Sequence, residues 1–78
     1  MTSERLNIAI VEDEQVFARA VAKTLSKAGY TCRIFGLVAD IRAHLDQEKP
    51  DLILLDMQLP DGSGLDFLAE RRERSSDV

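Results

Sequence analysis

The sequence predicts an α/β domain in which helices cover both faces of a parallel sheet. Strand and helix patterns alternate three times along the 78 residues, the strand patterns are short and apolar, and the helix patterns repeat at three- and four-residue spacing. Strands that alternate with helices are joined by right-handed crossovers and therefore form a parallel sheet. A chain of this length has room for one such domain.

The first half of the chain contains two of the strand and helix pairs. Residues 7–11 (NIAIV) are apolar and rich in β-branched side chains, which is typical of a buried strand. Apolar residues at helical spacing predict a helix over 16–28, and Gly29 follows at the position where helices commonly end. A weaker strand is expected at 30–35, and a short helix at 37–45.

The strongest strand pattern lies in the second half. Residues 51–56 (DLILLD) contain four consecutive apolar residues, which predict a strand buried on both faces of the sheet. A loop rich in turn residues follows at 59–64. Ser63 and Asp66 have the spacing of a capping box, so a third helix should begin near Leu65.

The composition excludes several classes of protein. Apolar runs of at most four residues are too short to cross a bilayer, and residues 1–6 lack the apolar core of a signal peptide. The single cysteine, Cys32, cannot form an internal disulfide, and Cys32 with His44 is too small a ligand set for zinc. A net charge of −4 argues against nucleic-acid contact by this segment. We therefore expect a cytoplasmic protein that does not contact a membrane.

Three carboxylates should meet at one edge of the sheet. Glu12 and Asp13 come directly after the first strand, and Asp56 ends the third. In a parallel sheet of this kind the functional site lies at the carboxyl ends of the strands. Carboxylates placed so close repel one another, and Mg²⁺, which prefers oxygen ligands, removes that repulsion. The sequence therefore predicts a Mg²⁺ site in which an aspartate is either a ligand or a nucleophile toward phosphorus; Glu12 and Asp13 could instead simply cap the first helix.

Two segments together resemble the receiver domain of two-component response regulators: IVEDE after the first strand and DLILLDMQLPDGSGLDFL around the third. GYTCRIFG and EKPDLILLD also fall where that family has them. The resemblance implies a flavodoxin-like parallel sheet with the strand order 2-1-3.

The resemblance also implies roles for individual residues. Asp56 looks like the aspartate that accepts a phosphoryl group from a sensor histidine kinase. Asp13 looks like a direct Mg²⁺ ligand, with Glu12 as the second acid of the pair. The remaining protein ligand looks like the backbone carbonyl of Gln58. The loop that holds this geometry resembles that of the family at Pro60, Gly62 and Gly64.

A complete receiver has five strands and five helices, and this chain reaches only the third predicted helix. The resemblance therefore implies that residues 1–78 are a partial receiver domain, without strands 4 and 5 and their helices. The strand-4 hydroxyl and the strand-5 lysine would then be absent, because none of Lys23, Lys27 and Lys49 matches that lysine. The third strand would become an open, apolar edge.

As a function, the resemblance implies a signalling phosphoacceptor rather than an enzyme, with at most Mg²⁺-dependent self-phosphorylation and dephosphorylation. Phosphorylation of Asp56 would regulate an output domain in the parent protein, in the commonest arrangement a DNA-binding transcriptional regulator. The alternative is an interaction module that pairs its open third strand with a second copy or a partner. A phosphatase that forms an aspartyl phosphate typically needs a second aspartate two residues after the first, where this chain has Gln58.

Overall fold

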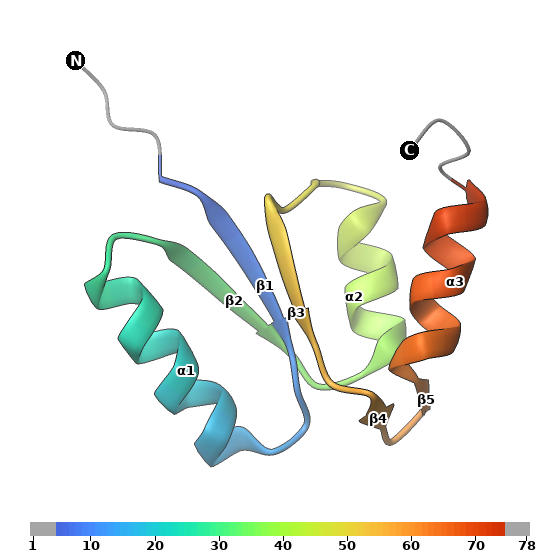
Figure 1. Ribbon diagram of the computed structural model, residues 1–78, viewed down its shortest axis with the longest axis horizontal. Coiled ribbons are helices and arrows are strands. Elements are labelled where there is room, and N and C mark those ends of the chain that lie inside the picture. The colour runs from blue at the N-terminus through green and yellow to red at the C-terminus, as the bar shows by residue number, and fades with distance from the viewer. Residues whose placement is uncertain (1–4, 75–78) are drawn as a thin grey trace.

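The computed structural model describes residues 5–74 and shows a three-stranded parallel sheet with helices on both faces (Figure 1). The strand order is β2-β1-β3, which confirms the predicted order and alternation. The longest helix has 13 residues, and no helix within the described residues is long and apolar enough to span a membrane. The elements are β1 (Asn7–Val11), α1 (Gln15–Lys27), β2 (Thr31–Phe35), α2 (Val38–Leu45), β3 (Leu52–Leu55), β4 (Gln58–Leu59), β5 (Gly62–Ser63) and α3 (Gly64–Arg74).

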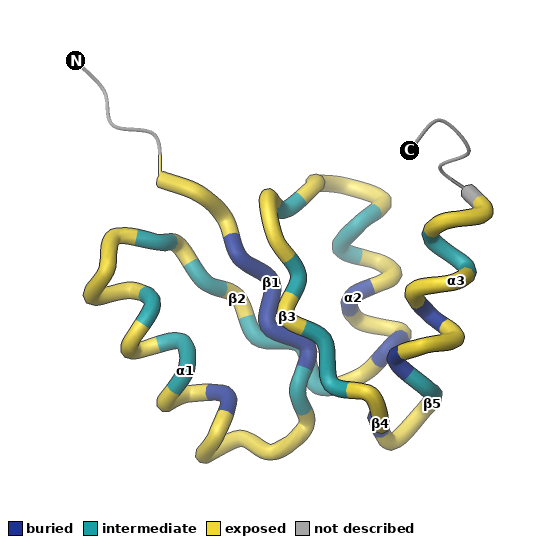
Figure 2. The backbone as a smooth tube through the Cα atoms, in the orientation of Figure 1, coloured by how far each residue is buried: buried dark blue, intermediate teal, exposed yellow. Residues whose placement is uncertain are grey.

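The central strand β1 is hydrogen-bonded along both of its edges. Its parallel register pairs Ile8 with Cys32 of β2 and with Leu52 of β3. Four of its five residues are buried, and this part of the strand is dark blue in Figure 2. Because it is short, apolar and rich in β-branched side chains, this segment suits a strand that is covered on both faces.

Successive residues of β1 point to opposite faces of the sheet and so supply two hydrophobic clusters. On one face, Ile8 and Ile10 pack with Ala18 of α1. On the other face, α2, α3 and the segment between β3 and α3 all contribute to the second cluster. We call this second cluster the α2–α3 cluster, and its buried members are Ala9, Val11, Val38, Ile41, Leu59 and Phe67.

The strand β3 differs from its sequence prediction, because it is half-buried on one face and exposed on the other. Ile53 and Leu55 pack against the α2–α3 cluster, as expected. Leu52 and Leu54, on the face that carries α1, are 51% and 37% exposed. Within residues 5–74, β3 is an edge strand that pairs with β1 alone, and α1 covers the β1–β2 side of that face. The apolar run therefore predicted the strand correctly and its burial only in part.

The loop after β3 forms a short antiparallel hairpin that the sequence analysis treated as irregular. Gln58 pairs with Ser63 and Leu59 with Gly62, giving β4 and β5. The Ser63 hydroxyl accepts a hydrogen bond from the backbone N–H of Asp66 at 3.3 Å, which is the N-terminal half of the predicted capping box. The hairpin thus connects β3 to α3 through ordered backbone.

The helix α2 is capped by a residue that lies far from it in the sequence. Leu37, which precedes the helix, has no polar side chain and makes no cap. Asp61, in the turn between β4 and β5, supplies one: its two carboxylate oxygens accept the backbone N–H groups of Val38 at 2.7 Å and Ala39 at 3.0 Å. These hydrogen bonds, first that from Ala39 and then that from Val38, lower the pKa of Asp61.

The Asp61 cap predicts an acid-dependent loss of stability. A carboxyl group with a lowered pKa in the folded state stabilises the fold fully above its ordinary pKa, and this stabilisation is lost as the pH falls through the lowered pKa. Asp61→Asn should therefore flatten the acid side of the curve of unfolding free energy against pH. Urea denaturation from about pH 7 to about pH 3 measures this. The same pH dependence in both proteins would contradict the assignment.

Candidate metal centre at the carboxyl edge of the sheet

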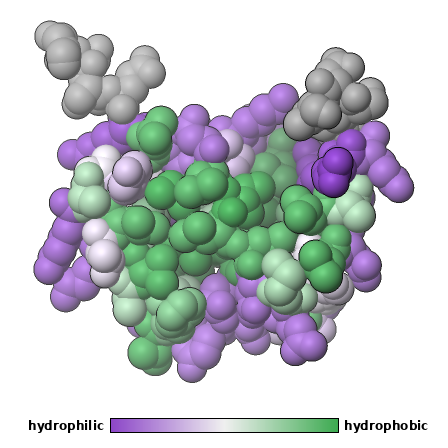
Figure 3. Space-filling model, in the orientation of Figure 1, coloured by the Kyte–Doolittle hydropathy of each residue, from purple (hydrophilic) through white to green (hydrophobic). Residues whose placement is uncertain are grey.

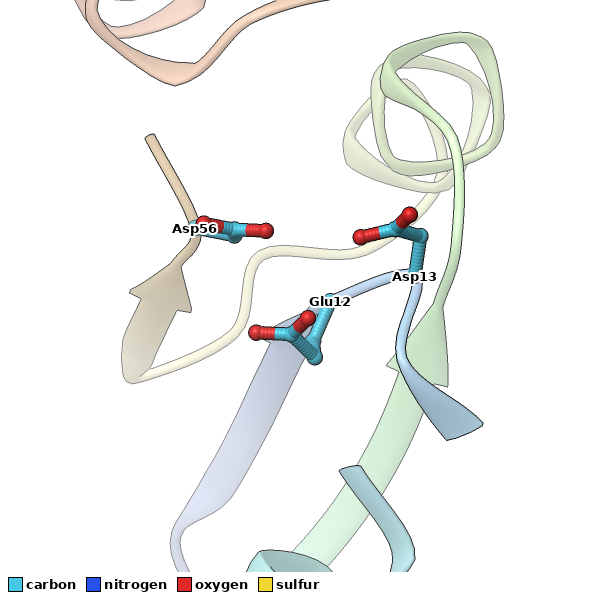
Figure 4. Close-up of side chains that lie close together, drawn as sticks. All are labelled: Glu12, Asp13 and Asp56. Atoms are coloured by element: carbon cyan, nitrogen blue, oxygen red, sulfur yellow. The ribbon is translucent and has the colours of Figure 1, made fainter. Parts of the chain in front are cut away.

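Glu12, Asp13 and Asp56 lie together where β1 and β3 end (Figure 4). One carboxylate oxygen of each residue lies within 4.8 Å of the others. Glu12 and Asp56 are half-buried, and Asp13 is exposed. The structure thus brings together the three carboxylates that the sequence analysis placed at one edge of the sheet, from segments more than forty residues apart.

The hydrogen-bond ladder of the sheet extends into this cluster and positions two of its members. The backbone N–H of Glu12 donates to the carbonyl of Phe35 at 2.9 Å. The backbone N–H of Asp56 donates to the carbonyl of Val11, also at 2.9 Å. Glu12 and Asp56 are therefore held at the ends of adjacent parallel strands by the same ladder that builds the sheet.

The turn between β1 and α1 orients the Glu12 side chain. The backbone N–H of Glu14 donates to Glu12 Oε2 at 3.1 Å. Glu14 itself is the N-cap of α1, since its Oε1 accepts the N–H groups of Val16 at 2.8 Å and Phe17 at 3.3 Å. Among the described residues, capping of α1 by side chains thus belongs to Glu14 rather than to Glu12 or Asp13, and Glu12 Oε1 is left for another partner.

The charge of the cluster is not compensated by protein cations. Within residues 5–74, no lysine or arginine forms an ion pair with Glu12, Asp13 or Asp56. Arg42 of α2 instead pairs with Glu70 of α3, at 2.7 Å between Nη2 and Oε1. Three carboxylates with converging oxygens and no cationic side chain among them fit a hard divalent cation such as Mg²⁺.

The backbone of Gln58, two residues after Asp56, lies close to the Asp56 carboxylate. The backbone N–H of Gln58 lies 3.4 Å from Asp56 Oδ1, a long hydrogen bond. Gln58 is exposed and begins β4, so its backbone lies next to the carboxylate cluster. Its role as a carbonyl ligand of the metal stays a prediction.

Gly64 packs against the backbone of Asp56. Its N–H donates to the carbonyl of Met57 at 2.8 Å, which closes the base of the hairpin. A Cβ at Gly64 would overlap the Asp56 carbonyl oxygen and lie 3.0 Å from the Met57 Cα. Of the three residues expected to shape this loop, Gly64 therefore has a direct steric reason to be glycine. Gly62 has a milder one, since its Cβ would lie 3.3 Å from Val38 Cγ2, and Pro60 lies exposed in the turn.

Sequence reasoning missed the role of Glu14 as the N-cap of α1 and the role of Asp61, which it placed only among turn formers. For Asp61, a signal was present at the start of α2, where Leu37 occupies the N-cap position. A helix whose own N-cap residue is apolar needs an acceptor from elsewhere to satisfy its first N–H groups. Asp61 supplies that acceptor over a separation of 22 and 23 residues.

The close approach of Gly64 predicts a large effect of a single methyl group. Gly64→Ala forces the hairpin backbone away from Asp56 and should cost about 1–3 kcal/mol of unfolding free energy, as overpacking typically does. Gly36→Ala is the matched control, because its Cβ would make only ordinary contacts at 3.9 Å and beyond. That variant should change stability by less than about 0.5 kcal/mol in the same urea denaturation. Equal stability of the two variants would contradict the packing described here.

Comparison with known proteins identifies relatives that match most of this chain. Residues 8–78 match the family model of the response regulator receiver domain. The KDP operon transcriptional regulatory protein KdpE of Escherichia coli K12 is 40% identical over 72 residues, and the TorCAD operon transcriptional regulatory protein TorR of the same strain is 39% identical over 70. Each alignment covers 90% of this chain, but only 31% and 30% of the relatives. The chain thus spans about a third of the length of these relatives.

Solved structures show the same likeness. The MaeR response regulator bound to beryllium trifluoride is 35% identical with a TM-score of 0.85, over 94% of this chain and 62% of that one. The signal receiver domain of a putative Luxo repressor protein from Vibrio parahaemolyticus is 28% identical with a TM-score of 0.85, over 92% of this chain and 55% of that one. Nearly all of the described fold therefore has a counterpart in receiver structures.

Proposed function

Since this chain belongs to the response regulator receiver family, we propose that it is the phosphoacceptor of a two-component phosphorelay and that Asp56 is the residue that is phosphorylated. The observation that carries this proposal is the convergence of Asp56 with Glu12 and Asp13 at the carboxyl edge of the sheet. An aspartate placed only as a turn former or cap would have no need of two further carboxylates beside it.

The proposed reaction is a phosphoryl transfer between two side chains. An Asp56 carboxylate oxygen attacks the phosphorus of a phosphohistidine on the kinase, and an O–P bond forms as the N–P bond breaks. The electron pair of the broken bond stays on the imidazole nitrogen of the kinase. The product is an acyl phosphate, which water hydrolyses to return the carboxylate.

The carboxylates of Glu12, Asp13 and Asp56, with the backbone carbonyl of Gln58, would hold Mg²⁺. A divalent ion at this place supplies positive charge that screens the incoming phosphoryl oxygens from the acidic cluster. The support for this ligand set is the spacing of the carboxylate oxygens and the absence of a pairing cation within residues 5–74. Glu12 is already oriented by the Glu14 N–H, which leaves one of its oxygens for the ion or for a bound water.

The proposed partners follow from the relatives. A sensor histidine kinase would donate the phosphoryl group, and an output domain in the parent protein would respond to it. KdpE and TorR are transcriptional regulatory proteins, which favours a DNA-binding output domain. We propose that this acidic segment acts in the cytoplasm as a signalling module and does not itself contact nucleic acid or membrane.

The phosphoacceptor assignment predicts a covalent change that mass spectrometry detects. In the presence of Mg²⁺ and a small phosphodonor such as acetyl phosphate, the protein should gain one phosphoryl group, and chelation of Mg²⁺ should prevent the gain. Asp56→Asn should gain none, because an amide oxygen is a poor nucleophile. Asp46→Asn, a change at an exposed aspartate after α2, should be labelled as the unchanged protein is.

Two outcomes of that experiment oppose the proposal. Labelling of Asp56→Asn would mean that another residue is the acceptor. No labelling of a protein that circular dichroism shows to be folded would mean that the cluster is not sufficient for phosphoryl transfer.

A second candidate function, association with a second copy of the chain, is favoured by the open edge of β3. Apolar side chains gather over β3 and the helices beside it in Figure 3, and Leu52 and Leu54 are among the exposed ones. A two-fold axis perpendicular to the sheet would pair β3 antiparallel with its copy and would keep the exposed leucines of both copies on one face. Edge strands with apolar side chains and no charge between their ends are suited to such pairing.

The second candidate predicts a mass that depends on concentration. Sedimentation or light scattering should show a shift from monomer to dimer between about 10 µM and about 1 mM, the range of a weak self-association. Leu54→Lys should keep the protein monomeric, because a lysine on an edge strand opposes pairing. Val16→Lys is the control, since Val16 is a highly exposed residue of α1 outside the β3 edge. A strict monomer over the whole range would exclude this candidate.

A further inference from the structure

We propose that Asp61 is a positioning residue of the metal site, which acts by fastening the β4–β5 hairpin to the N-terminus of α2. The inference rests on the proposed function, because it concerns the same carboxylate cluster. Asp61 does not contact that cluster. It acts through the hairpin backbone, whose first residue, Gln58, lies beside Asp56.

The attachment has two hydrogen bonds and a fixed direction. Asp61 Oδ1 accepts the Val38 N–H at 2.7 Å, and Oδ2 accepts the Ala39 N–H at 3.0 Å. Both oxygens are used, so the carboxylate cannot rotate without losing a bond. The charge of Asp61 also lies at the positive end of the helix dipole, which favours it there.

The helix end that Asp61 holds is packed into the hydrophobic core. Val38 and Ile41 are buried in the α2–α3 cluster, and Ile41 is fully buried. The first turn of α2 is therefore fixed to the sheet by packing. It provides a rigid reference to which a neighbouring loop can be attached.

The hairpin has other contacts, and none of them joins its outer end to α2 by a hydrogen bond within the described residues. Leu59 is buried in the α2–α3 cluster, which holds β4 against the sheet. The Gly64 N–H bonds the Met57 carbonyl, which closes the base of the hairpin. The pairing of Leu59 with Gly62 closes the turn at Pro60 and Asp61 but does not tie its tip to α2 by a hydrogen bond. The Asp61 carboxylate supplies such hydrogen bonds, and Asp61 is separated from Gln58 by only two intervening residues.

Release of the turn would disturb the backbone at Gln58 and its contact with Asp56 Oδ1. Metal ligands must be held within a few tenths of an ångström, and residues that support them from outside typically change metal affinity about 10- to 100-fold. Because Asp61 acts through backbone, we expect the lower end of that range.

The test compares Mg²⁺ dissociation constants, measured by calorimetric or NMR titration of the full chain. Asp61→Ala removes both hydrogen bonds and should weaken Mg²⁺ binding about tenfold. Asp61→Asn keeps one acceptor oxygen and one bond, so its loss should be smaller. Since both variants remove the same charge, equal losses in the two would show that charge alone matters, and this would overturn the proposal.

A third variant separates positioning from stability. Arg42→Ala removes the exposed ion pair between α2 and α3 and the weak charge interaction of Arg42 with Asp61, but it keeps both hydrogen bonds of Asp61. It should therefore cost a little stability and leave Mg²⁺ affinity nearly unchanged. Loss of affinity in Arg42→Ala equal to that in Asp61→Ala would reduce the effect to general destabilisation and overturn the proposal. If Asp61→Ala does not fold, Asp61→Asn decides alone, and an affinity equal to that of the unchanged protein overturns it.

The proposed function fails in a different way. Mg²⁺ binding that Asp56→Asn does not weaken, or no binding by the unchanged protein, would remove the metal site itself, and the positioning role with it. Binding that depends on Asp56 but not on Asp61 would leave the metal site in place and overturn only the role of Asp61.

Discussion

The structure depends on one strand that is paired along both edges and covered on both faces. Because β1 is hydrogen-bonded to β2 and to β3, its register sets the register of the whole sheet. Because its side chains alternate, Ile8 and Ile10 support the α1 face while Ala9 and Val11 support the α2–α3 face. The same ladder runs one step past the sheet and holds Glu12 and Asp56 at adjacent positions. The position of the acidic cluster is therefore set by the hydrogen bonds of the sheet.

This arrangement explains how a small protein tolerates three carboxylates so close together. The cluster is half-buried and open to solvent at Asp13, so solvent still screens it. The groups that contact its members and position them directly belong to the backbone: the carbonyls of Phe35 and Val11, the N–H of Glu14 and the close approach of Gly64. Most side-chain changes around the site would leave these contacts intact, whereas a change of backbone path would not.

Much of this could be predicted from the sequence, and the rest has physical reasons. The alternation of strand and helix patterns was enough for the parallel sheet and for the meeting of Glu12, Asp13 and Asp56, since parallel strands must end at one edge. The strand order came from the resemblance to receiver domains rather than from the pattern itself. The exposure of Leu52 and Leu54 was not predicted, because an apolar run signals burial without saying which neighbours provide it. The roles of Glu14 and Asp61 were also missed. Glu is not a usual N-cap residue, and the apolar N-cap of α2 shows that an acceptor must come from elsewhere without showing which residue supplies it.

The three acidic residues after β1, Glu12, Asp13 and Glu14, have different roles that depend on their order, and they do not act as a uniform patch of charge. Glu12 lies next to Asp56 in the cluster and is held by the backbone N–H of Glu14. Asp13 is the exposed member of the cluster, and Glu14 is the N-cap of α1. A permutation of these residues would preserve the charge and the composition. An aspartate in place of Glu12 or Glu14 would nevertheless have a shorter side chain, which would change its distance to the backbone N–H groups from which it now accepts hydrogen bonds. An insertion of one residue would rotate the start of the helix against the strand. A search of sequences by acidic content would miss this distinction, whereas position relative to the end of the strand retains it.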